Sequence, residues 1–230
     1  MEITRLELLT TDIDAQRAFY TTRLGLPLVT DSQDSITIQA GSTRLVFSHM
    51  DAETTPTYHF AFNIPEHQFT EAKQWLEQRV ALLGTESDPP DKVFHSQSWN
   101  ADSIYFYDAA GNVAELIARH ALPDSGTEPF SGRSIRRIDE IGLPTPDVIS
   151  TVDAIRDRTG FTPWNTALND AFVPVGDEHG LFIVVKTGRI WLATGDMESQ
   201  VAPITVAIKN TAGETFTLPD HPYHIRTTSH

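Results

Sequence analysis

The chain has 230 residues, with 17 lysines and arginines against 31 aspartates and glutamates, nine histidines and no cysteine. The absence of cysteine excludes disulfide scaffolds, thiolate nucleophiles, cysteine-based zinc fingers and iron–sulfur clusters. The net charge of −14 argues against binding to nucleic acids or to anionic membrane surfaces. A small-molecule enzyme or a binding protein remains, and a metal site in it would have to use histidines and carboxylates.

Short strands and helices alternate along the first 120 residues. The first unit is predicted as a strand, a helix and three strands, over 3–10, 13–22, 28–30, 35–39 and 43–48. The second unit has the same types of element in the same order, over 58–64, 65–80, 92–96, 103–108 and 112–118. Asp12 is predicted to cap the first helix, and Gly25 is predicted to follow its end.

A third copy of the pattern follows a predicted linker at 121–134, which is rich in Pro, Gly and Ser. Its elements are again a strand, a helix and three strands, over 137–143, 147–158, 171–175, 181–185 and 189–193. A further strand over 204–209 is typical of the opening of a fourth copy that lacks its helix. The tail over 210–230 is polar, and we expect it to be loosely held.

The repeat can be followed residue by residue. A shift of 135 carries Asp12 onto Asp147 and Gly25 onto Gly160, and a shift of 54 carries the strand of Arg5 onto that of His59. An internal repeat of this length predicts an α+β fold of tandem βαβββ modules. We expect modules one and two to pair into a pocket-bearing unit over 1–120, followed by the linker over 121–134. A third module with an extra strand is expected over 135–209, and the tail over 210–230.

Five stretches carry a family resemblance: 3–12, Phe19-Tyr20, Leu24-Gly25, 59–62 and 107–116. In them the chain resembles the vicinal oxygen chelate superfamily of glyoxalases, bleomycin-resistance proteins and extradiol dioxygenases. The match covers residues 3–120, and it is weaker over 135–209. The resemblance implies that two modules pair into a U-shaped, partly open barrel around a pocket. It also implies a divalent metal there (Fe, Mn, Ni or Zn) and a lyase, isomerase or ring-cleaving dioxygenase that uses it as a Lewis acid.

The resemblance places two metal ligands in the second module, His59 and Glu115. The family's remaining ligand position falls on Arg5, whose guanidinium stays protonated and cannot coordinate a metal. His95, on the second strand of that module, is the predicted substitute. Two functions therefore stay open: a metalloenzyme with a degenerate metal site, or a metal-free protein that sequesters a small molecule as bleomycin-resistance proteins do.

Other residues are candidates for the same pocket. Glu7 shares a strand face with Arg5, so it is predicted to act as a base or to neutralise that arginine. Trp99, Tyr105 and Tyr107 are expected to stack on a planar ligand, with packing in the core as the alternative.

The sequence also bears on location and assembly. The first residues lack the basic stretch and apolar run of a secretory signal, and no apolar run approaches the ~20 residues of a membrane span, so we expect a cytoplasmic protein. The third module lacks a complete partner, which predicts a homodimer. The expected partners are thus a small molecule and a second copy of the chain, without nucleic acid or membrane.

Overall fold

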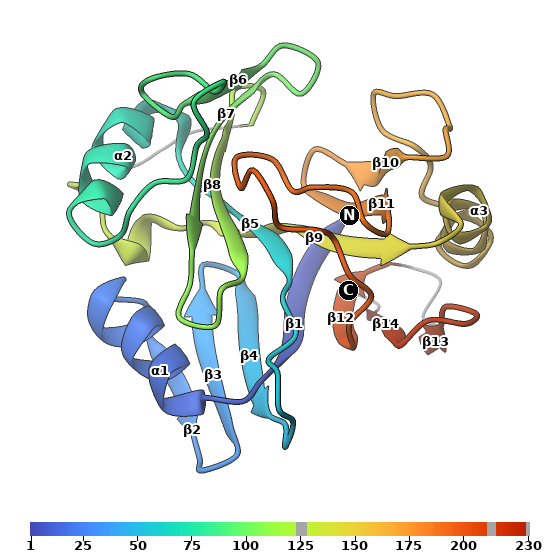
Figure 1. Cartoon of the computed structure of the whole chain (residues 1–230), viewed down its shortest axis with the longest axis horizontal. Helices are drawn as coiled ribbons and strands as arrows, with labels where there is room; N and C mark the ends of the chain where they lie inside the picture. Colours follow the sequence, from blue (N-terminus) through green and yellow to red (C-terminus); the bar gives the residue numbers. More distant parts are fainter. Residues whose placement is uncertain (123–127, 211–214, 229–230) are drawn as a thin grey trace.

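The computed structural model describes residues 1–122, 128–210 and 215–228 and contains two seven-stranded mixed sheets (Figure 1). In spatial order, the first sheet consists of β13 (Thr215–Thr217), β14 (Tyr223–Thr228), β12 (Ile204–Lys209), β1 (Glu2–Thr10), β4 (Thr43–His49), β3 (Ser35–Ala40) and β2 (Leu28–Asp31). The second sheet consists of β10 (Phe172–Asp177), β11 (Gly180–Lys186), β9 (Arg137–Thr145), β5 (His59–Asn63), β8 (Val113–Arg119), β7 (Ala101–Tyr107) and β6 (Phe94–Ser96).

Helical segments connect the strands. They are α1 (Ile13–Arg17) continued by η1 (Ala18–Arg23), η2 (Glu66–Gln68) continued by α2 (Phe69–Glu77), η3 (Gly132–Ser134) and α3 (Val148–Thr159). An aspartate caps the start of α1 and of α3. The Asp12 carboxylate accepts a hydrogen bond from the Ala15 N–H at 2.8 Å, and that of Asp147 accepts one from Ser150 at 3.0 Å. α3 ends at Gly160, which has the left-handed φ of 77° that glycine adopts easily. The three predicted helices are confirmed.

The two sheets are built to one plan. At the centre of each, two strands run antiparallel: β1 beside β12 in the first sheet and β5 beside β9 in the second. Each central strand has a parallel outer neighbour, β4 and β14 in the first sheet and β8 and β11 in the second. The predicted α+β fold of tandem βαβββ modules is therefore confirmed, and each sheet joins two modules edge to edge.

The modules that share a sheet differ from the expected pairing within 1–120. Module one shares its sheet with the C-terminal strands, and module two shares its sheet with module three. The first strand of a module lies at that module's edge, where its backbone N–H and C=O groups need a partner strand. Either neighbouring module could supply one, so sequence order does not decide the pairing.

The C-terminal residues form part of the first sheet, which corrects the prediction of a loosely held tail. In β14 the buried Tyr223, Ile225 and Thr227 alternate with exposed residues, as in a strand with one face on the core. This strand runs parallel to β12, the first strand of the fourth module, and pairs with it. Residues 211–214 and 229–230 of the predicted tail and 123–127 of the predicted linker lie outside the described residues.

The strand predicted over 189–193 is a loop. Ala193 has a φ of 66°, which a strand does not accommodate, and Ile190 makes only an isolated bridge to Glu198. Module three has another isolated β-bridge before β10, where Pro163 pairs with Val175 of that strand. The loop is therefore free to cover the face of the second sheet.

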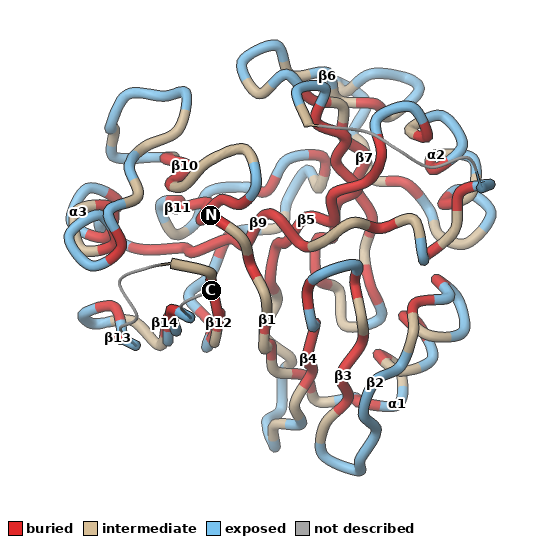
Figure 2. The backbone as a smooth tube through the Cα atoms, turned by 180° about the vertical axis from the view of Figure 1, so that it is seen from behind, coloured by how far each residue is buried: buried red, intermediate tan, exposed pale blue. Residues whose placement is uncertain are grey.

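Aromatic rings pack between the two sheets. Tyr20 stacks on Phe47 of β4, with ring centroids 5.3 Å apart, and also contacts Phe62 of β5 at 6.3 Å. Figure 2 shows buried backbone along β5 and β9 at the centre of the second sheet. Among the described residues, no helix has both the length and the apolar character needed to span a membrane.

Candidate metal centre

A pocket of about 430 Å³ lies over the second sheet. Its floor includes the polar side chains of His59, Glu115 and Glu140. Most of its wall is apolar and aromatic, and includes Phe94, Trp99, Tyr105, Phe172, Ile183, Trp191 and Leu192. A few polar groups at the base of an apolar pocket are typical of a small-molecule site.

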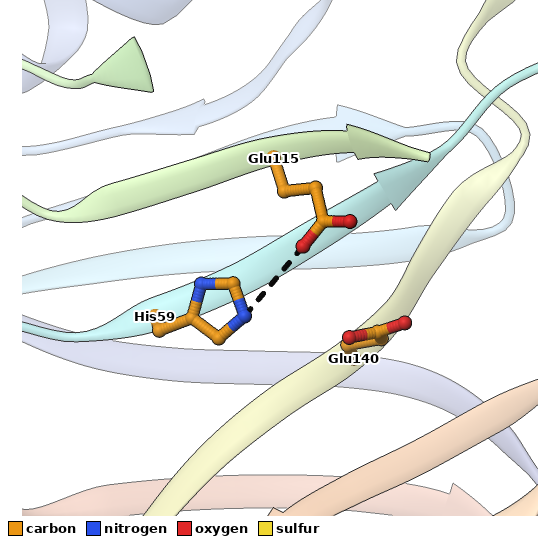
Figure 3. Close-up of side chains that lie close together, drawn as sticks. All are labelled: His59, Glu115 and Glu140. Atoms are coloured by element: carbon orange, nitrogen blue, oxygen red, sulfur yellow. Dashed lines mark ion pairs between the residues drawn. The ribbon is translucent and has the colours of Figure 1, made fainter. Parts of the chain in front are cut away.

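The strand register brings the three polar side chains to one point. Ala61 of β5 pairs with Glu115 of β8 on one side and with Glu140 of β9 on the other. His59 precedes Ala61 by two residues, so it shares the same face of the sheet. One ligand atom from each of the three side chains lies within 4.8 Å of the others, and Figure 3 shows His59 and Glu115 turned toward each other with Glu140 beside them.

His59 presents a free nitrogen to this point. Its Nδ1 lies 3.0 Å from the carbonyl oxygen of Val113, so Nδ1 carries the proton and donates it. The Nε2 lone pair then faces Glu115, 3.6 Å from its Oε2 atom. Burial lowers the pKa of His59 to about 4, which keeps the imidazole neutral at pH 7. A neutral histidine whose second nitrogen is held by a backbone carbonyl has the arrangement of a metal ligand.

Burial raises the pKa of both glutamates, although Arg119 opposes the rise in each. Burial raises the pKa of Glu115 to about 7, and hydrogen bonds from Ser103 and Tyr105 oppose this rise. Burial, together with repulsion from Glu115, raises the pKa of Glu140 well above its ordinary value. A cation between two buried carboxylates that face one another would favour the ionised form of both. A divalent metal among these three residues would supply that cation, and imidazole with carboxylate oxygen is a donor set for first-row metals.

Arg119 is the cation that contacts Glu140. Its Nε lies 3.0 Å from Oδ2 of Asp139, and its Nη2 lies 2.5 Å from Oε1 of Glu140. The rings of Trp99 and Trp164 lie 5.6 and 5.4 Å from its guanidinium carbon. Arg119 thus holds one oxygen of Glu140 and leaves the other for a ligand in the pocket.

Trp191 covers the histidine. The two rings lie 4.7 Å apart between centroids, and Trp191 is only 6% exposed. The indole fits because residue 142 is glycine: a Cβ at Gly142 would come within 2.7 Å of the Trp191 ring. The loop that contains Trp191 therefore covers His59 and lines the pocket.

The structure separates the predicted site residues into groups. His59 and Glu115 lie together, with Trp99 and Tyr105 in the same pocket. His95 lines the outer part of that pocket, with its side chain 69% exposed and Nδ1 2.6 Å from Asp102. A second group lies elsewhere: Tyr107 lines a separate depression beside α1, and Arg5 and Glu7 line one over the first sheet.

Glu140 was not predicted from the sequence, although the repeat contains the signal for it. The same shift of 135 that relates Asp12 to Asp147 carries Arg5 onto Glu140. The ligand position that falls on an arginine in module one therefore falls on a carboxylate in module three. Because module three shares a sheet with module two, Glu140 reaches His59 and Arg5 does not.

Comparison with solved structures gives the fold. A putative dioxygenase from Bacillus subtilis is similar over 99% of this chain and 85% of its own, with a TM-score of 0.64 and 15% sequence identity. Lactoylglutathione lyase from Agrobacterium tumefaciens matches 50% of this chain and 92% of its own (TM-score 0.41, 22% identity). The fosfomycin resistance protein FosX from Listeria monocytogenes, complexed with Mn(II) and sulfate, matches 50% and 87% (TM-score 0.38, 21% identity).

In sequence, no protein-family model and no curated protein matches the chain. The Bacillus subtilis structure aligns over nearly the whole chain, so the fold that the resemblance implied is confirmed.

Proposed function

We propose that His59, Glu115 and Glu140 bind a divalent metal and that the chain is a metal-dependent enzyme acting on a small organic molecule. The observation that carries the proposal is the buried group of one imidazole and two carboxylates on adjacent strands, at the floor of an aromatic pocket. Fe, Mn, Ni and Zn all accept this donor set, and two carboxylates favour Fe or Mn over softer ions.

Three protein ligands leave coordination positions open for a substrate. When bound, the metal would act as a Lewis acid that polarises substrate oxygens. The chain's own residues do the remaining work: Trp191 keeps water away from His59, and Arg119 fixes Glu140. Burial raises the pKa of Tyr105 well above its usual range, so its phenol keeps the proton that it donates to Glu115.

The pocket wall favours one reaction among those of the superfamily. Phe94, Tyr105 and Trp191 present ring faces and edges, with 5.2 Å between the centroids of the first two. Aromatic walls suit a planar ring, and the proposed metal selects a ring with adjacent oxygen atoms. We therefore place ring cleavage with O₂ as co-substrate ahead of lyase or isomerase chemistry.

A turnover experiment tests this function. Protein loaded with Fe(II) or Mn(II) is offered catechols under air, and oxygen uptake is followed; α-keto hemithioacetals test lyase activity in parallel. Oxygen uptake that requires a catechol and is lost in His59→Ala and Glu140→Gln supports the proposal. Metal-loaded protein that turns over none of these compounds contradicts the proposed reaction.

The second candidate is a metal-free binding protein. Arg119 favours it, because its guanidinium already supplies positive charge beside Glu140. In that case calorimetry with a planar ligand would give the same affinity with and without a chelator. For the proposed enzyme, the chelator should abolish binding of a ligand that has adjacent oxygens.

The proposed site is contained in one chain and does not depend on a second subunit. The homodimer and the cytoplasmic location stay predictions from the sequence. The mass in solution at micromolar concentration tests the first of them.

A further inference from the structure

The first sheet repeats the metal-centre positions of the second sheet with different residues. In both sheets a central alanine pairs with one residue on its parallel neighbour and one on its antiparallel neighbour. In the second sheet this row is Glu115, Ala61 and Glu140. In the first sheet the row is Arg226, Ala207 and Arg5.

The correspondence extends to the third ligand. His59 precedes Ala61 by two residues on β5, and Thr205 precedes Ala207 by two residues on β12. Because β5 and β12 have matching neighbours and directions, Thr205 takes the position of the histidine. The first sheet therefore places two guanidinium groups and a hydroxyl where the second sheet places two carboxylates and an imidazole. The charge of the site is reversed.

A depression of about 450 Å³ lies over this row, and Arg5, Arg226, Thr205 and Ala207 all line it. Arg44 of β4, which pairs with Arg5, lines it too. Hydroxyl groups complete the wall, from Thr4, Ser42 and Thr228. The guanidinium groups bring N–H donors, as an oxyanion requires, and the hydroxyls of Ser42 and Thr205 can donate as well. The hydroxyls of Thr4 and Thr228 already donate to the carbonyl oxygens of Ala207 and Ile208.

Arginines outnumber carboxylates among the residues that line this depression. Nε of Arg5 lies 2.5 Å from Oε1 of Glu7, which orients the guanidinium and leaves its terminal nitrogens available. Arg44 and Arg226 are exposed, and neither forms an ion pair with a carboxylate among the residues that the structure describes. The depression thus has three guanidinium groups and one carboxylate in a chain whose net charge is −14.

We propose that this depression binds a small molecule through a phosphate or carboxylate group, with Arg5 and Arg226 on two sides of the oxyanion. Guanidinium groups bind such oxyanions with paired, charge-assisted hydrogen bonds. The strongly acidic chain argues against a nucleic acid as the source of the phosphate. The inference rests on the strand register of the first sheet and holds whether or not a metal occupies the second.

The test is calorimetric titration of the full chain with inorganic phosphate and, separately, with citrate, each at the ionic strength of a sodium chloride control. We expect saturable binding of at least one of them, and the one that binds shows which group the depression takes. Arg226→Ala and Arg44→Ala should weaken that binding by about tenfold or more, because each removes a charge-assisted contact.

Arg133→Ala is the matched control, since Arg133 is exposed and lies outside the depression. It should bind as the wild type does, and so should Glu140→Gln, which separates this site from the metal centre. Saturable binding that Arg226→Ala leaves unchanged would overturn the proposal. So would heats for phosphate and citrate that match the chloride control.

Discussion

The guanidinium of Arg119 contacts Glu140 and Asp139 at once, at 2.5 Å and 3.0 Å, while its side chain is 1% exposed. Arg119 ends β8, and the two acidic residues are consecutive in β9. The pairing of β9 with β5 shifts at this place, because Ala61 pairs with Glu140 and Phe62 with Ile138, which leaves Asp139 as the extra residue of a β-bulge. The bulge brings both acidic side chains to the same guanidinium. Arg119 is therefore a positioning residue for Glu140.

Replacing Arg119 should destabilise the protein strongly. Arg119→Met leaves two buried carboxylates without their cation, and breaking a buried ion pair in this way costs about 3–5 kcal/mol. Urea unfolding measures the loss. Arg156→Met is the control, because the side chain of Arg156 is 45% exposed and its ion pairs contribute little. Equal losses in the two variants would show that Arg119 is not a structural cation.

A methyl group at residue 142 should displace the indole over His59. In Gly142→Ala the new Cβ would lie 2.7 Å from the Trp191 ring, and overpacking of this kind costs about 1–3 kcal/mol. Intrinsic fluorescence should report greater exposure of tryptophan. Adding Trp191→Ala to this variant should restore the room for the Cβ. Unchanged stability and fluorescence in Gly142→Ala would mean that Trp191 is not held against the sheet.

The stability of metal-free protein should depend on Glu115 between pH 4.5 and 7. The pKa of this residue rises from 4.5 to about 7 on folding, so the folded state binds more protons in that window. The free energy of unfolding therefore falls as pH rises through it, by up to 1.4 kcal/mol per unit of pKa change, an order-of-magnitude figure.

Histidine 59 acts in the opposite direction, because its pKa falls from 6.5 to about 4 on folding and its contribution is lost as pH falls. Glu115→Gln removes the first effect, and it also removes the repulsion that helps to raise the pKa of Glu140, which acts in the same direction. With chelator present, the free energy of unfolding of Glu115→Gln minus that of the wild type should increase as pH rises from 4.5 to 7. Parallel curves for the two proteins would contradict the raised pKa.

Local chemistry made much of the fold predictable. Asp12 and Asp147 begin helices by accepting backbone hydrogen bonds, and Gly160 ends one in the left-handed region. These effects act within a few residues, so a single sequence contains them. The choice of which module edges meet depends on contacts between residues far apart in the chain. That choice decides whether Arg5 or Glu140 lies beside His59.

The loop around Trp191 also depends on contacts between distant residues, which the sequence does not reveal. Residues 189–193 have the composition of a strand, but Ala193 has a left-handed backbone, and Arg189, Trp191 and Leu192 line the pocket instead. The packing of Trp191 against Gly142 joins residues that no local pattern relates. Pocket walls built from such contacts become visible only in the folded chain.

Metal content tests the central claim most directly. Wild-type protein purified without chelators and analysed by atomic emission should contain a single divalent metal ion per chain. Glu140→Gln should lose it, whereas Glu77→Gln, a change at an exposed glutamate of α2, should keep it. Wild-type protein that contains no metal and gains none on dialysis against Fe(II), Mn(II), Ni(II) or Zn(II) would contradict the account. So would Glu140→Gln protein that retains its metal in full.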